Sequence, residues 1–245
     1  MAIRTDPADR AARAGQDTGA ARAVPLPRTL TSEYAARWNE LSERWAARPG
    51  SVLGTLGPAG TSSDLTARYL AAEHGLSVEL FRTFDEVLDQ LLLEKLDFAL
   101  VPSAYAGLTR FHWHRDLRLR AFFPRATPEY GIATGAGGGI PPGGGPLSVA
   151  AMWEVRRIYA EVAPPALRGR EVRWVDASST QHAAEIVAAG GARLAVTNAP
   201  GVRAHGLRWV ATRPGAEILW TLFDRTRRPG GAEEAEQPFI ADRRP

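Results

Sequence analysis

Three short segments carry most of the side chains that could do chemistry, and each follows a run of apolar residues. The first is Gly57–Ser63, in which three consecutive hydroxyl residues follow two glycines and a proline. An amphipathic helical pattern begins directly after it, so the segment is predicted to lead from a strand into a helix N-terminus. Unpaired N–H groups and a partial positive charge make such an end attractive to anions. The residues expected to bind a carboxylate here are Gly60, Thr61, Ser62 and Ser63.

The second segment is Val101–Leu108, and the third is Ser178–Thr180, which opens a predicted helix at Gln181. Ligands of open α/β sheets bind beyond the carboxyl ends of strands, so the three segments could share one cleft. Two helix N-termini rich in hydroxyls would suit a small dianion, and Ser179 and Thr180 are expected to bind it. Each segment alone could be an ordinary helix cap, because Ser and Thr are frequent N-cap residues.

His112 and His114 would face the same side if they lay on a strand. Their spacing suggests no third ligand, so metal binding is not predicted. The sequence also lacks a Walker pattern and a dinucleotide-binding glycine pattern in a strand-to-helix context. We therefore expect no cofactor and no metal.

Composition places the chain among ordinary globular proteins. Its 245 residues can form one two-lobed domain or two small ones, with 44% apolar and 23% charged residues. A formal net charge of +3 is too small to indicate a nucleic-acid partner. The absence of cysteine excludes disulfides, thiolate metal sites and a cysteine nucleophile.

Localisation follows from hydropathy. No apolar run reaches the roughly 18 residues of a membrane span. The first residues lack the apolar core of a signal peptide. We expect a cytoplasmic protein without a membrane partner.

The chain is predicted to begin and end in segments without a core. Residues 1–28 carry few large apolar side chains and are expected to be a disordered tail. Residues 227–245 are rich in proline, glycine and charge and are expected to be mobile. An amphipathic helix is predicted over residues 29–50, because one apolar stripe is formed by Tyr34, Trp38, Leu41 and Trp45. It could be a packing helix or the contact of a homodimer.

From residue 51 onward, strand-like and helix-like segments alternate. Predicted strands are 77–80, 98–101, 117–123, 130–134, 147–151, 172–175, 194–197, 207–210 and 217–223. Predicted helices are 83–93, 154–162 and 181–189. This alternation predicts an α/β fold with mainly parallel sheets.

The three segments resemble motifs of the prephenate dehydratase family. Its Gly-Pro-x-Gly-Thr-x-Ser motif matches Gly57–Ser63, and its Ser-Thr before an alanine-rich helix matches Ser179-Thr180. The family's Val-Pro-Ile-Glu-Asn-Ser is here Val101–Ala106, without the Glu-Asn pair. Its Thr-Arg-Phe is here Thr221–Phe223, with leucine in place of arginine.

These departures resemble the prephenate decarboxylase branch of the bacilysin-biosynthesis type. That branch has Gly-Thr-Ser-Ser in the first loop and Val-Pro-x-Ala-Tyr-x-Gly in the second. It also has Thr-Pro-x-Tyr-Gly, here Thr127–Gly131, then Thr-Asn, here Thr197-Asn198, and Trp-(Ser/Thr)-Leu-Phe, here Trp220–Phe223. The resemblance covers roughly residues 51–225.

The resemblance implies two α/β lobes with an interlobe cleft, as in the dehydratase catalytic domain and type II periplasmic binding proteins. The lobes are expected at 51–126 with 203–226, and at 127–202. It also implies a carbon–carbon lyase of secondary metabolism. This enzyme would release CO2 from prephenate without aromatisation, giving dihydro-4-hydroxyphenylpyruvate.

Roles follow from the same resemblance. Tyr105 is expected to orient the ring hydroxyl or donate the ring proton, and Asn198 and Thr221 to complete the polar wall. Asn198 is counted among the substrate-binding residues, and Thr221 with Tyr105 among the catalytic ones. Two alternatives stay open: a prephenate dehydratase, and a non-catalytic module that binds small anions.

Overall fold

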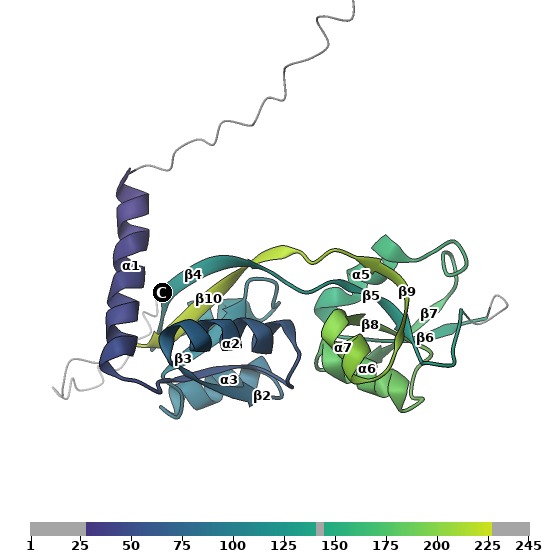
Figure 1. Ribbon diagram of the computed structural model, residues 1–245, viewed down its shortest axis with the longest axis horizontal. Coiled ribbons are helices and arrows are strands. Elements are labelled where there is room, and N and C mark those ends of the chain that lie inside the picture. Colours follow the sequence, from purple (N-terminus) through teal and green to yellow (C-terminus); the bar gives the residue numbers. More distant parts are fainter. Residues whose placement is uncertain (1–27, 141–144, 227–245) are drawn as a thin grey trace, which may run out of the picture. The chain divides into compact units, whose positions relative to one another are not determined.

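The computed structural model describes residues 28–140 and 145–226 (Figure 1). The tails expected at 1–28 and 227–245 lie outside the described residues, apart from Arg28. The first helix is α1 (Arg28–Ala47), which covers most of the segment predicted as an amphipathic helix. Within the described residues, no helix is both long and apolar enough to cross a bilayer.

The first lobe is built on a five-stranded sheet with the order β2-β1-β3-β10-β4. Its strands are β1 (Val52–Leu56), β2 (Ser77–Phe81), β3 (Phe98–Pro102), β4 (Leu117–Ala126) and β10 (Glu217–Arg225). Its further helices are α2 (Ser62–His74), α3 (Phe84–Leu92) and α4 (Leu108–His112).

The second lobe repeats this plan with the order β7-β6-β8-β5-β9. Its strands are β5 (Tyr130–Thr134), β6 (Leu147–Ala151), β7 (Val172–Asp176), β8 (Leu194–Asn198) and β9 (Arg208–Arg213). Its helices are the short 3₁₀ turn η2 (Trp153–Val155), α5 (Arg156–Val162), α6 (Thr180–Ala188) and α7 (Ala199–Ala204).

The α/β class is confirmed, but the sheets are mixed rather than mainly parallel. In the first sheet β1 pairs parallel with β2 and β3, whereas β10 pairs antiparallel with β3 and β4. The second sheet has the same division around β6 and β5. The reason is the chain path: β4 leads out of the first lobe and β10 leads back into it, so these two neighbours run in opposite directions.

The return to the first lobe comes later than residue 203, where the sequence placed it. β9 pairs with β5 over Tyr130–Thr134 and therefore belongs to the second sheet. The chain re-enters the first sheet only at Glu217, where β10 begins to pair with β4. A strand's own residues do not specify its partner, so the pattern predicted β9 but not the sheet that contains it.

Helices cover both faces of each sheet, and the central strands are buried throughout. In β3, Phe98 and Leu100 pack toward Leu41 and Trp45 of α1. The alternate residues of β3, Ala99 and Val101, join the core cluster beneath α3 and α4. The period-two alternation thus divides an almost uniformly apolar strand between two cores.

A buried carboxylate joins α1 to the last two strands of the first sheet. Asp224 of β10 is 3% exposed and accepts hydrogen bonds from Arg44 (2.8 Å), Arg118 (3.0 Å) and Arg120 (2.7 Å). Arg120 is itself only 12% exposed. Removing the carboxylate would leave this guanidinium buried without its main counter-charge.

We therefore expect Asp224→Asn to lower the free energy of unfolding by about 3 kcal/mol, because the ion network loses its buried carboxylate and keeps only the exposed Glu40. Asp176→Asn is the control, since Asp176 pairs with Arg156 but is 93% exposed. Because the Asp176 carboxylate is exposed to solvent, its pair with Arg156 should contribute at most about 1 kcal/mol. Urea denaturation measures both, and equal losses would contradict the role assigned to Asp224.

Candidate functional site

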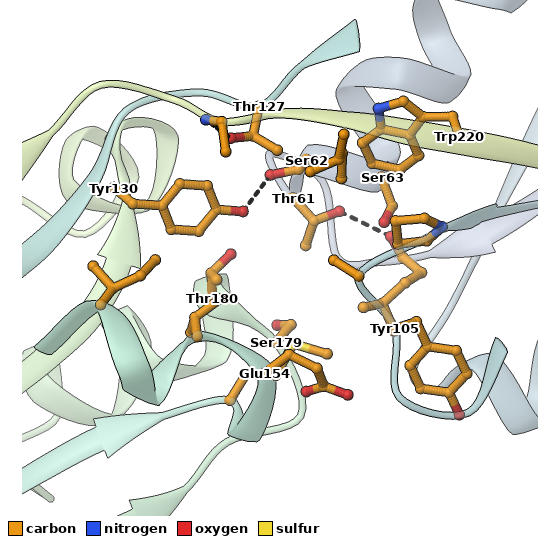
Figure 2. A pocket seen from close by; sticks show the side chains of 18 of the residues that line it. Thr61, Ser62, Ser63, Tyr105, Thr127, Tyr130, Glu154, Ser179, Thr180 and Trp220 are labelled. Carbon is orange, nitrogen blue, oxygen red and sulfur yellow. Dashed lines mark hydrogen bonds between the residues drawn. The ribbon is translucent and has the colours of Figure 1, made fainter. Parts of the chain in front are cut away.

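A pocket of about 240 Å³ is lined by residues of both lobes (Figure 2). Much of its wall is apolar, with Phe84, Met152 and Trp220 among the larger side chains. The polar part includes Thr61, Ser62, Ser63, Tyr105, Thr127, Tyr130, Glu154, Ser179, Thr180 and Arg213. Apolar walls with a few convergent polar groups are typical of small-molecule sites.

The N-terminus of α2 forms one side of the pocket. Thr61 is the N-cap: its hydroxyl accepts from Asp64 N (3.1 Å) and donates to Leu56 O (2.8 Å). The next two residues, Ser62 and Ser63, occupy the first helical positions, whose N–H groups have no partner within the helix. Thr61 thus shapes the loop, while Ser62 and Ser63 present donors to a ligand.

The N-terminus of α6 repeats this arrangement from the second lobe. Ser179 is the N-cap and accepts from His182 N (3.0 Å). Thr180 follows at the first helical position and is buried. Among the described residues, neither its hydroxyl nor that of Ser63 has a hydrogen-bond partner. The two ends therefore bring free hydroxyls and unpaired N–H groups to one pocket, as the sequence indicated.

Gly60 and Asn198 connect the lobes instead of lining the pocket. The Gly60 carbonyl accepts from Gln181 Nε2 (2.9 Å) and from Asn198 Nδ2 (3.2 Å). Asn198 is fully buried, and its Oδ1 caps α7 by accepting from Gly201 N (2.9 Å). Gly60 and Asn198 were expected to contact the substrate, but neither residue is part of the described lining of the pocket.

The two residues expected to be catalytic have other partners. Thr221 is buried and donates to Val101 O (2.6 Å) across the β10–β3 pair, so it lies outside the described pocket lining. Tyr105 contributes its ring to the pocket and packs on Phe84 at 4.5 Å. Its hydroxyl donates to Asp85 (3.2 Å), and Figure 2 shows it directed away from Thr180. Neither hydroxyl is placed for proton transfer in the pocket.

Asp85 and Tyr105 form a charged cluster with Arg110 at the edge of the first lobe. The hydrogen bond from Arg110 holds the pKa of Asp85 below its ordinary value. Burial, followed by the nearby Asp85 charge, raises the pKa of Tyr105. The Tyr105 hydroxyl is thus engaged by Asp85 and is not directed into the pocket.

Tyr130 lines the pocket but was not among the site residues expected from the sequence. Its hydroxyl lies 2.6 Å from Ser62 Oγ, across the two lobes, and both residues line the pocket (Figure 2). Burial raises the pKa of Tyr130, while the hydrogen bond with Ser62 acts in the opposite direction and is weaker. The Thr127–Gly131 motif was the signal in the sequence that could have identified this tyrosine. The motif did not indicate where the tyrosine hydroxyl would point.

Two substitutions relative to the dehydratase motifs differ in where they lie. Ala104, at the position of the dehydratase glutamate, lines the pocket and leaves it without that acid. Leu222, at the position of the dehydratase arginine, is buried in the core that includes Leu41 and Trp45. Only the first substitution changes the described lining of the pocket directly.

The histidine pair does not lie on a strand. His112 ends α4, and its ring meets Phe223 edge-on at 5.0 Å. His114 follows the helix, and its Nδ1 accepts from Asp116 N (3.2 Å). Within the described residues, no group of three or more His, Asp or Glu side chains is arranged to hold a metal ion.

Comparison with known proteins identifies the family. No family model matches the chain. The prephenate decarboxylase of Planktothrix agardhii (strain NIVA-CYA 126/8) is 30% identical over 190 residues, covering 71% of this chain and 88% of that protein. The chain belongs to the prephenate decarboxylase family. The prephenate decarboxylase of Bacillus subtilis (strain 168) is 28% identical over 184 residues, covering 71% of this chain and 86% of that protein.

Solved structures identify the fold of this prephenate decarboxylase family member. A prephenate dehydratase from Arthrobacter aurescens, in complex with L-Phe, superposes with a TM-score of 0.52 at 18% identity. The match covers 76% of this chain and 63% of the dehydratase. The expected similarity to the dehydratase fold is therefore confirmed, and at this identity the comparison extends to the fold alone.

The cross-lobe contact at Gly60 yields a stability prediction. Gly60 has φ +86°, and a Cβ there would lie 2.7 Å from Gln181 Nε2. Gly60→Ala should therefore cost about 1 kcal/mol for the left-handed backbone, and about 1–3 kcal/mol more for displaced cross-lobe hydrogen bonds.

Gly75→Ala provides a matched control on α2. Gly75 has φ +65°, but a Cβ would meet nothing within 4 Å. It should show the backbone cost alone. Chemical denaturation of both variants measures the difference, and equal destabilisation would show that the Gly60 contact contributes nothing.

Proposed function

We propose that this chain removes CO2 from prephenate while leaving the ring hydroxyl in place and the ring non-aromatic. The observation that carries the proposal is the 30% identity to a prephenate decarboxylase over 88% of that protein. The chemistry of the pocket supports it independently. Prephenate is a small dianion with a carboxylate on its ring and a second one on its pyruvyl side chain.

The helix N-termini of α2 and α6 suit this charge. Ser63 and Thr180 offer hydroxyls without a partner among the described residues, beside the unpaired N–H groups of each first turn. Helix N-termini attract anions through partial charges. They hold a carboxylate without neutralising it outright.

The reaction needs one bond broken and one proton delivered. When the ring carboxylate leaves as CO2, its bonding electron pair forms a double bond to the neighbouring ring carbon, and the electrons of the former double bond shift to the next carbon. A proton must then be added at the far end of that allyl unit. Tyr130 is proposed as its donor, because its buried hydroxyl lines the pocket. The proton that it gives up is replaced from solvent, and the neighbouring Ser62 hydroxyl can relay it.

The raised pKa of Tyr130 also favours decarboxylation over dehydration. Burial keeps its phenol neutral and weakly acidic. A weak acid can protonate the strongly basic carbanion-like ring, but it gives little help to a departing hydroxide. Ala104 adds to this selectivity, because the dehydratase motif has a glutamate there.

The decisive experiment incubates purified protein with prephenate and identifies the product. We expect one CO2 per prephenate and dihydro-4-hydroxyphenylpyruvate with its hydroxyl retained. Phenylpyruvate as the product would instead identify a dehydratase. Binding without turnover would identify an anion-binding module.

Tyr130→Phe tests the proposed donor. Loss of a general acid should lower kcat by about 100-fold or more, whereas KM should change little. Tyr159→Phe is the matched control, because Tyr159 lies in the core of the second lobe and its buried hydroxyl has no hydrogen-bond partner in the described structure. Comparable kcat values for the two variants would refute the role of Tyr130.

The pKa of Tyr130 also sets a pH dependence. Because burial raises it above its ordinary value of about 10, the phenol stays protonated throughout neutral and mildly alkaline solution. The alkaline limb of kcat should therefore stay level to about pH 9.5. A steady fall of kcat between pH 7 and 9 in the wild type would contradict a neutral Tyr130 as the donor.

A further inference from the structure

Arg213 lies beside Tyr130 at the edge of the second sheet. The antiparallel register of β5 and β9 sets the two residues directly opposite one another. Opposed residues of an antiparallel pair point to the same face of the sheet. Consistent with this, both side chains line the pocket.

Two of the three guanidinium nitrogens of Arg213 have hydrogen-bond partners within the described structure. Its Nη1 donates to Glu161 Oε2 (2.7 Å), and its Nε donates to Pro214 O (3.3 Å). Nη2 has no hydrogen-bond partner among the described residues. The side chain of Glu161 is 52% exposed, so solvent screens its charge, and the pair leaves Arg213 attractive to a second anion.

Charge among the described lining of the pocket is sparse. Arg213 is the one fully cationic side chain there, and Glu154 is the one carboxylate. Every other polar contribution comes from hydroxyls and backbone groups. A dianion in this pocket therefore meets a single full positive charge, which can pair closely with only one of its two carboxylates.

The chemistry of the reaction decides which carboxylate this should be. The ring carboxylate loses its negative charge as CO2 departs, so a cation beside it would stabilise the reactant more than the transition state. The pyruvyl carboxylate keeps its charge throughout. A cation on that group contributes binding energy and orientation without opposing the chemical step.

The side of the pocket opposite Tyr130 has no cation among its described lining: it carries apolar side chains and the carboxylate of Glu154, which lies near Tyr105. Phe84 packs on the ring of Tyr105, and Figure 2 shows Tyr105 across the pocket from Tyr130. Met152 lines the pocket and packs against the same core as Phe84. Transfer of a carboxylate toward such a wall favours its conversion into neutral CO2.

We propose that Arg213 binds the pyruvyl carboxylate of the substrate and thereby points the ring carboxylate toward the opposite side of the pocket, where the described lining has no cation. This inference rests on the proposed function, because it assigns an orientation to prephenate. Arg213 is then a substrate-binding residue that sets which of two carboxylates is retained. Glu161 is a positioning residue that holds its guanidinium.

The test combines kinetics with binding of two monoanions. Phenylpyruvate carries the side-chain carboxylate alone, and benzoate carries a ring carboxylate alone. Arg213→Ala should raise KM for prephenate roughly 10- to 100-fold with a much smaller change in kcat. It should weaken phenylpyruvate binding, measured by calorimetry, by a similar factor and leave benzoate binding or its absence as in the wild type.

Two further variants sharpen the result. Arg213→Lys retains the charge but not the planar fork, so it should recover part of the phenylpyruvate affinity. Arg208→Ala is the matched control, because Arg208 is an exposed arginine on the same strand outside the described pocket lining. It should behave as the wild type in both assays.

Each outcome of these assays either supports the proposal for Arg213 or overturns it. Selective loss of benzoate binding in Arg213→Ala would reverse the orientation and overturn the proposal. Identical behaviour of Arg213→Ala and Arg208→Ala would overturn it as well. If the wild type binds phenylpyruvate through Arg213 but releases no CO2 from prephenate, the carboxylate site stands and the proposed function fails.

Discussion

The carbonyl oxygen of Gly60 accepts two hydrogen bonds from the other lobe, and the pocket depends on this contact. Gln181 and Asn198 both donate to it. Gln181 belongs to the first turn of α6, so the bond ties the N-terminus of α6 to the loop that precedes α2. The distance between the two helix N-termini is thereby held by one backbone acceptor and two side-chain amide donors.

Two connecting segments complete this constraint. The chain leaves the first lobe after β4 and returns into β10, and the two connections are bonded to one another through Thr127 and Ala216. Both residues also line the pocket. The two connections between the lobes therefore form part of the pocket wall and continue into β4 and β10. Near the other end of β10, Asp224 pairs with Arg44 of α1.

Much of this arrangement could be predicted from the sequence because it is local. The hydroxyl runs at Thr61 and Ser179 identify helix starts, and their position after strands identifies a common edge. The directions of single side chains could not be predicted in the same way. Thr221 lies in the middle of β10 and Asn198 at the end of β8, and partners distant in sequence bind both side chains away from the pocket. Tyr130 reaches Ser62 for the same non-local reason.

The pairing of strands was equally non-local. The sequence of β9 predicts a strand, but its place beside β5 is decided by sheet geometry, and this placement brings Arg213 to the pocket. Because the sequence assigned residues 203–226 to the first lobe, it gave no indication that Arg213 lies in the second sheet beside the pocket.

The hydroxyl residues within each run differ in their hydrogen bonding, and this difference has a consequence for how related pockets evolve. In both runs the first hydroxyl caps the helix, whereas a later hydroxyl, that of Ser63 or Thr180, lines the pocket and has no hydrogen-bond partner among the described residues. Folding stability is thus concentrated in the cap residues, and ligand preference in their neighbours. Mutation at the neighbouring positions can alter what the pocket accepts at little cost in stability, so a common scaffold can be turned toward different carboxylic acids.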